Sequence, residues 1–221
     1  MFSYIGKTYI ISGIILIDYY KVGEKTMREL TSIQEKILDK ALYLIGKNSS
    51  FNIPIRAIAK EANVNVSAIN YYFRTKEEMM KYVKEFYLDN AIAAYAALDS
   101  EEYSDEEKIT IVANEIMEYT IKYPGVLIIL REAIKNRDSD EMDAKIVNIT
   151  EKLNKKLYDT LSKVLNADNL NSQYGNMVFL SSIIYPIMNM EINDFNENII
   201  DSKEERIKYI SYIIDRLKSN K

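Results

Sequence analysis

The segment from Asn52 to Lys84, NIPIRAIAKEANVNVSAINYYFRTKEEMMKYVK, limits the folds open to this chain more than any other part of the sequence. Pro54 suits the first position of a helix, where the N–H that proline lacks would have no partner within the helix. Apolar residues then recur at the three- and four-residue intervals of one helix face, at Ile55, Ile58, Ala59 and Ala62. The pattern predicts a short amphipathic helix.

A polar turn, Asn63-Val64-Asn65, separates this helix from a second one. Asn63 tolerates the left-handed conformation that ends many helices, and the side chain of Asn65 suits an N-cap. The second helix is predicted from about Val66 to Tyr72, with Ile69 directed toward the first helix. Two short helices around such a turn form a helix-turn-helix.

Several groups of residues in and after this turn resemble the TetR (tetracycline-repressor-like) family. In order and without a gap, they match that family's G-V-S, (A/T)-(L/I), (Y/H)-(Y/H)-F and K-E-E-L series: Asn63-Val64-Asn65, Ala68-Ile69, Tyr71-Tyr72-Phe73 and Lys76-Glu77-Glu78-Met79. Arg56-Ala57-Ile58-Ala59 is similar to the family's V-R-D-I-A segment. The preceding stretch, Ser32 to Leu44, has the pattern of an amphipathic helix with one apolar stripe: Ile33, Ile37, Ala41 and Leu44.

The sequence departs from the family pattern at two points. Asn63 replaces the usual turn glycine, and asparagine adopts the left-handed conformation at modest cost. Ile53 and Pro54 replace the hydroxyl residues that often begin the family's second helix and contact phosphate. These two side chains therefore cannot supply that contact.

The resemblance implies which residues contact DNA, because the second helix of such a motif lies in the major groove. The implied set is Asn65, Val66, Ser67, Asn70, Tyr71, Arg74 and Lys76. The polar side chains of Asn65, Ser67 and Asn70 suit base edges or phosphates, and Val66 suits a thymine methyl. Tyr71 and Lys76 suit phosphates.

Other interpretations stay open for individual residues of this motif. Ser67 fits a solvated helix position as well as a DNA contact, and Arg74 fits an exposed surface charge. Thr75 fits a cap of the following helix. Three apolar or aromatic residues are expected in the core of the motif: Ile69, Tyr72 and Phe73.

Composition excludes most enzyme chemistry. The chain has 221 residues, 48% of them hydrophobic, which suffices for a full core in one large domain or two small ones. It contains neither Cys nor His, so disulfides, the usual zinc ligands and imidazole bases are absent. No nucleotide-binding or nucleophile-elbow motif occurs. We expect a protein that is not an enzyme and has no cofactor or metal.

Charge is distributed unevenly along the chain. The net charge is −4, but residues 27–90 carry +2, residues 91–221 carry −7 and residues 1–26 carry +1. An acidic C-terminal part would repel phosphates. The distribution therefore favours DNA binding by the N-terminal part alone.

Residues 1–26 have the weakest pattern of any segment. Their apolar run, Tyr9 to Ile17, is interrupted by Ser12 and Gly13 and is too short to span a bilayer. It also makes a poor signal peptide. Two interpretations remain: an extension that precedes a true start at Met27, or an ordered arm that packs on the body or reaches DNA. We expect a cytoplasmic protein with no membrane partner.

The remaining sequence is expected to be helical, which gives an all-α fold. Lys76 to Leu98 is predicted as one helix, and Ser104 with Glu107 has the capping-box pattern. Pro124-Gly125 is expected to break the chain. The predicted helices after Lys76 are 76–98, 104–123, 126–136, 140–165, 169–192 and 202–217. We expect a helix-turn-helix domain at 27–75 and a helical effector-binding and dimerisation domain at 76–221.

The resemblance places an effector cavity and a dimer interface in the second domain. Aromatic and methionine residues lie on helices that surround a ligand cavity in that family, although they also suit an ordinary core: Tyr119, Tyr123, Met177, Phe179, Tyr185, Met188 and Met190. The last two helices carry more apolar residues than a monomer needs: Val178, Ile183, Ile184, Ile187, Ile207, Ile210, Ile213, Ile214 and Leu217. The resemblance implies that these helices form a four-helix bundle in a twofold homodimer.

The sequence thus predicts a homodimeric transcriptional regulator, a repressor that binds double-stranded DNA at a near-palindromic operator and is released by a small-molecule effector of unknown type. Two alternatives remain. One is an all-α small-molecule carrier that retains the helix-turn-helix as a scaffold. The other is a protein-interaction module that uses its amphipathic terminal helices.

Overall fold

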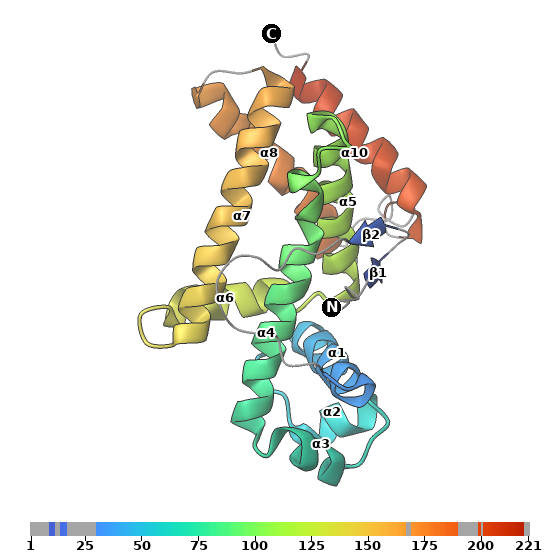
Figure 1. Ribbon diagram of the computed structural model, residues 1–221, viewed down its shortest axis with the longest axis vertical. Coiled ribbons are helices and arrows are strands. Elements are labelled where there is room, and N and C mark those ends of the chain that lie inside the picture. Colours follow the sequence, from blue (N-terminus) through green and yellow to red (C-terminus); the bar gives the residue numbers. More distant parts are fainter. Residues whose placement is uncertain are drawn as a thin grey trace, which may run out of the picture. The chain divides into compact units, whose positions relative to one another are not determined.

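The computed structural model describes residues 9–11, 14–16, 30–166, 169–189, 199 and 201–218 (Figure 1). Residues 1–30 and 31–221 form separate compact units. In the first unit, strand β1 (Tyr9–Ile11) pairs antiparallel with β2 (Ile14–Leu16), and Tyr9 lies opposite Leu16. The other expectations for residues 1–26 lie outside the described residues. Everything described after residue 31 is helix or turn, so the all-α fold class is confirmed.

Residues 31–75 form three short helices that we call the head: α1 (Ser32–Lys47), α2 (Ile55–Glu61) and α3 (Val66–Phe73). Helix α1 begins with a capping box between Thr31 and Gln34 and buries one full face. Ile33 is an exception to the predicted stripe, because it lies in the first turn, beside an open hollow, and is 41% exposed.

Residues 76–218 form the body. Its elements are α4 (Lys76–Ala94), the 3₁₀ turn η1 (Ala96–Asp99), α5 (Asp105–Lys122), α6 (Val126–Asn136), α7 (Glu141–Leu165), α8 (Asn169–Met188) and α10 (Lys203–Lys218). Helix α7 packs against α4, α5, α6 and α8, and α10 packs against α5 and α8. Helices α1 and α4 pack together, so the head is joined to the body by more than the chain itself.

The predicted boundaries are close to the observed ones, with one clear difference. The helix expected over 76–98 ends at Ala94, because Tyr95 turns out of helical geometry and its N–H bonds to the Ile92 oxygen, 3.1 Å away. The capping box of Ser104 and Glu107 is present, and the chain breaks at Pro124-Gly125. The end of the helix predicted over 169–192 is described only to Met188.

A buried arginine connects the last helix, α10, to α5 by hydrogen bonds. Arg206 of α10 is 6% exposed, and its guanidinium donates to Asn114 Oδ1 at 3.0 Å and to Glu118 Oε2 at 3.3 Å, both on α5. Helices α5, α7, α8 and α10 also share an apolar core cluster, which includes Met117, Phe179 and Ile210. No described helix is both long enough and apolar enough to cross a bilayer.

Candidate DNA-binding site

The turn between α2 and α3 is a Schellman motif. Asn63 adopts a φ of 51°, and its N–H bonds to the Lys60 oxygen at 3.1 Å. The N–H of Val64 reaches back to the Ala59 oxygen at 2.9 Å. These two bonds satisfy carbonyl groups that the end of α2 leaves open. Asparagine thus takes the left-handed position that the sequence predicted for it.

Helix α3 begins at Val66 because Asn65 caps it. The Asn65 Oδ1 atom accepts a hydrogen bond from the Ala68 N–H at 2.7 Å. One lone pair of this oxygen is therefore engaged in the cap, and a partner outside the helix can use the second lone pair or the amide N–H groups of Asn65. Of the predicted DNA contacts, Asn65 is the one whose main role in the structure is local.

One face of α3 is open to solvent. Ser67, Asn70, Tyr71 and Arg74 lie at i, i+3, i+4 and i+7, and all four are exposed. Tyr71 is the most open large side chain of the set, at 81% exposure. The structure therefore brings four of the seven predicted DNA residues onto a single surface, which we call the α3 face.

The opposite side of α3 anchors it in the head. Ile69 and Phe73 are each 1% exposed, as predicted for the core, and the Phe73 ring meets Tyr82 of α4 edge to face at 5.4 Å. Tyr72 is only half-buried, which differs from the prediction. Its ring packs edge to face on Tyr71 at 5.1 Å, so Tyr72 supports the α3 face from the side. Val66 is also half-buried.

Lys76 lies beside the α3 face with its ammonium already engaged. Its Nζ donates a hydrogen bond to Asn52 Oδ1, and Thr75 caps α4 by accepting from the Glu78 N–H at 3.1 Å. Asn52 precedes the buried Ile53, which is 2% exposed and fixes this segment in the head core. Sequence reasoning did not single out Asn52. Its position two residues before Pro54, next to the start of α2, was the feature of the sequence that could have indicated it.

Arg74 has a conformation that few residues adopt. It ends α3 with φ 61° and ψ −57°, and its N–H bonds to the Asn70 oxygen at 2.9 Å. Non-glycine residues at positive φ store strain, and such strain is often found at binding sites. The turn directs the exposed Arg74 away from the head core.

The residues predicted to line an effector cavity are not brought together. Phe179 is fully buried in the apolar core, whereas Met177, Tyr185 and Met188 are 67%, 58% and 51% exposed on the outer side of α8. These three side chains therefore do not face the interior of the described chain, because α8 turns the other face, with Phe179, inward. Their place in an effector site stays a prediction. Met190 lies outside the described residues.

Tyr119 and Tyr123 belong instead to a cluster of tyrosines between α4, α5 and α7. The Tyr119 hydroxyl donates to the Tyr87 carbonyl oxygen at 3.3 Å, and the Tyr95 hydroxyl donates to Asn154 Oδ1 at 2.9 Å. Burial raises the pKa of Tyr87 to about 12, so this hydroxyl remains protonated at neutral pH. Aromatic rings and hydroxyl groups thus converge at the centre of the body.

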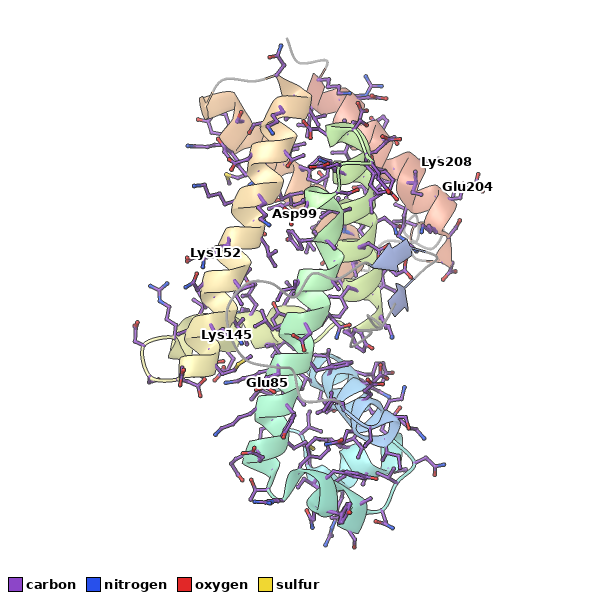
Figure 2. All side chains as sticks on the ribbon, viewed as in Figure 1. Glu85, Asp99, Lys145, Lys152, Glu204 and Lys208 are labelled. Atoms are coloured by element: carbon purple, nitrogen blue, oxygen red, sulfur yellow. The ribbon has the colours of Figure 1, made fainter. Side chains whose placement is uncertain are left out.

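A carboxylate lies beside this cluster. Burial and the neighbouring Glu85 raise the pKa of Asp89, and Lys145 lowers it; together they give a pKa of about 6. Glu85 and Lys145 stand on the adjacent helices α4 and α7 (Figure 2). The described residues contain no group of His, Cys, Asp or Glu side chains suited to hold a metal ion.

The outer face of α8 carries an apolar stripe that no described residue covers. Its members recur at helical spacing: Tyr174, Met177, Val178, Tyr185 and Met188, each at least 49% exposed. Ile207 and Tyr212 of α10 are 36% and 56% exposed. Most of the apolar residues of α8 and α10 that were predicted to form the dimer interface lie instead in the core of the chain itself. Among them are Ile183, Ile187, Ile210, Ile213 and Ile214.

Comparison with known proteins supports the interpretation of the head. Residues 37–83, from α1 to α4, match the family model described as "Bacterial regulatory proteins, tetR family". The probable HTH-type transcriptional regulator YttP of Bacillus subtilis (strain 168) is 32% identical over 90 residues, which are 40% of this chain and 44% of that relative. The match thus spans less than half the length of this curated relative.

Solved structures share the fold of most of the chain. A TetR-like transcriptional regulator from Rhodococcus sp. RHA1 superposes with a TM-score of 0.61 at 12% identity, covering 88% of this chain and all of the other. The transcriptional regulator FadR from Bacillus subtilis, solved in complex with stearoyl-CoA, superposes with a TM-score of 0.54 at 18% identity, covering 85% and 98%. The head is thus similar in sequence to the TetR family of bacterial regulatory proteins, and most of the chain shares the fold of a solved TetR-like regulator.

Proposed function

We propose that the chain is a DNA-binding transcriptional repressor that acts as a homodimer and is released from its operator by a small molecule. The α3 face carries this proposal. Four exposed side chains that suit bases and phosphates stand on one side of a helix held at both ends by hydrogen bonds: Ser67, Asn70, Tyr71 and Arg74. A helix presented in this way fits the major groove.

Different residues of the head should serve different parts of binding. Asn70 suits bidentate pairing with an adenine edge, which would contribute to base preference. Tyr71 and Arg74 suit phosphates, which position the helix without reading sequence. Lys76 and Asn52 form a linked donor and acceptor at the start of α4, which suits a phosphate next to the groove.

The uncovered stripe of α8 supports the homodimer. Exposed apolar side chains at helical spacing mark an interface, and a twofold axis would let the stripe cover itself. Such a dimer would present two α3 faces to successive major grooves, about 34 Å apart. Replacing Met177 with Glu puts a charge in the middle of the stripe. Sedimentation should then show a monomer, whereas a dimer that persists would place the interface elsewhere.

The tyrosine cluster between α4, α5 and α7 is the proposed place for the effector. Its rings and hydroxyl groups suit a largely apolar ligand with a polar end. The complex of the structural relative FadR with stearoyl-CoA suggests a long-chain acyl-CoA as a first probe. Binding would raise the melting temperature of the wild-type protein, and Tyr119→Phe would reduce that shift. Equal shifts in both proteins would place the ligand elsewhere.

DNA binding is tested by selecting bound fragments from a random DNA pool and measuring their affinity at several salt concentrations. We expect a near-palindromic site bound in the nanomolar range, with affinity that falls steeply as salt rises. Asn70→Ala should weaken binding and relax base preference, whereas Asn148→Ala, at an exposed position of α7, should change neither. No selected sequence, or equal affinity of Asn70→Ala and wild type for it, would refute the proposed docking.

A further inference from the structure

Helix α1 of the head touches the turn between α5 and α6 backbone to backbone. A Cβ atom placed on Gly46 would lie 2.3 Å from the Gly125 nitrogen, and one placed on Gly125 would lie 2.7 Å from both the Gly46 nitrogen and the Leu42 oxygen. Side-chain ends move aside readily, but backbone atoms do not. Any side chain at either position would therefore force α1 and the turn apart.

Neither glycine is required by its conformation. Gly46 lies within α1, and Gly125 has φ −72° and ψ −10°, which every residue adopts. Alanine favours such geometry over glycine. The glycines are therefore explained by the space between the two backbones, so the close approach is a specific feature of this joint.

A hydrogen bond holds the same two segments together. The Tyr123 hydroxyl donates to Asp39 Oδ1, two turns before Gly46 on α1. Tyr123 is only 3% exposed, and burial together with the bond to Asp39 raises its pKa, which keeps the hydroxyl a donor. Lys122 Nζ adds a positive charge 3.7 Å from the same carboxylate oxygen.

The turn is connected on its other side to the tyrosine cluster. The rings of Tyr119 and Tyr123 meet edge to face at 5.2 Å, and the Tyr119 hydroxyl bonds to the backbone of α4 at Tyr87. Helix α6 begins directly after Gly125 and packs along α7. A shift of α5 or α6 in the body is therefore passed to backbone that touches α1.

We propose that the turn Tyr123–Gly125 is a joint through which the body fixes the orientation of the head, with the contact of Gly46 and Gly125 as a stop and the bond from Tyr123 to Asp39 as a latch. The packing of α1 and α3 on α4 is one connection between the head and the body, and the turn adds a second connection, directly to α1. The regulatory role of this joint rests on the proposed DNA-binding function.

The joint is tested by measuring the distance between head and body directly. Because the sequence contains no cysteine, Lys60→Cys on α2 and Lys152→Cys on α7 would supply the only two thiols for spin labels, both at exposed positions (Lys152 in Figure 2). Labelled protein is diluted with unlabelled protein so that distances within one chain dominate. Gly125→Ala should shift the distance distribution, and Tyr123→Phe should broaden it.

The matched controls lie elsewhere in the body. In Gly175→Ala the new Cβ meets only the Cδ1 atom of Leu165, a side-chain end, so no change in distance is expected. Tyr212→Phe removes a hydroxyl from an exposed tyrosine of α10. On the DNA selected with wild-type protein, Gly125→Ala and Tyr123→Phe should bind at least about fivefold more weakly than these controls, in keeping with the usual size of couplings between sites.

The outcomes separate the joint from the proposed function. Unchanged distance distributions in both Gly125→Ala and Tyr123→Phe would overturn the joint, as would weaker DNA binding without a change in distance. If wild-type protein selects no DNA, the proposed function fails, while the distance measurement still tests the joint. Asp39→Asn keeps an acceptor for Tyr123 and should broaden the distribution less than Tyr123→Phe. A broader distribution for Asp39→Asn than for Tyr123→Phe would refute the latch.

Discussion

Lys84 is the residue whose removal should destabilise this protein most clearly through charge. It lies on α4 with 8% exposure, and its Nζ contacts Asp143 Oδ1 of α7 at 2.6 Å. Asp143 is 0% exposed, and neither of its oxygens has a well-directed hydrogen bond within the described residues. The ammonium of Lys84 is therefore the main compensation for a buried carboxylate.

The size of the effect follows from burial. Replacing Lys84 with Met keeps the length and apolar character of the side chain but leaves the Asp143 charge without its partner. Removing one member of a buried pair costs about 3–5 kcal/mol. For a chain of this length, each kcal/mol lowers the melting temperature by about 2–4 °C, so we expect a decrease of about 10 °C. Asp140, 3.5 Å from Lys84, is partly exposed and should contribute little.

Urea unfolding at one fixed protein concentration measures this loss, because a dimer would make the midpoint depend on concentration. Lys81→Met, at an exposed position on the same helix, is the control and should change stability by less than about 0.5 kcal/mol. The double variant Lys84→Met with Asp143→Leu should recover most of the loss, because both charges are gone. Equal stability of the Lys84 and Lys81 variants would refute the argument.

Three further predictions concern single residues. The pKa of Asp89 is raised to about 6 in the folded state, so its contribution to stability is present below about pH 4 and is lost as the pH rises through 6. In thermal unfolding, Asp89→Asn should therefore be about 2 kcal/mol more stable than wild type at pH 7 and no different at pH 4. Arg74→Gly should relieve the strain at φ 61° and raise stability by about 1 kcal/mol in urea, while weakening DNA binding in a mobility shift; parallel losses in both assays would contradict this. Asn63→Ala should lose about 1 kcal/mol, because alanine is disfavoured at φ 51°, whereas Asn63→Gly should unfold at the same urea concentration as wild type or a higher one.

Local chemistry explains why so much of the secondary structure was predictable. The apolar spacing of α2, the left-handed Asn63, the caps at Asn65 and Ser104 and the break at Pro124 each depend on a few adjacent residues. Such signals act within one turn of helix and need no knowledge of the rest of the fold. The exposed face of α3 followed from the same periodicity, once Ile69 and Phe73 marked the buried side.

In the body, the direction of a side chain depends on the packing of helices that are distant in sequence. Met177, Tyr185 and Met188 have the same residue types as a cavity lining, but their direction depends on which side of α8 meets α5 and α7. Apolar residues occur on both sides of α8, so their spacing does not show which side is buried. The packing of α8 on α5 and α7 buries the side with Phe179 and Ile183. The assignment of Tyr119 and Tyr123 to a cluster with Tyr87 likewise depends on α4 and α5 meeting across a gap of about thirty residues in sequence.

The helices, their caps and the helix-turn-helix could be predicted from the sequence, because they depend on interactions between residues close in the chain. Tertiary structure alone decided which charges are buried together, as for Lys84 and Asp143, and which backbones touch, as for Gly46 and Gly125. Those pairs are separated by 59 and 79 residues. Their contacts are set by the packing of whole helices, to which each single residue contributes only a small part.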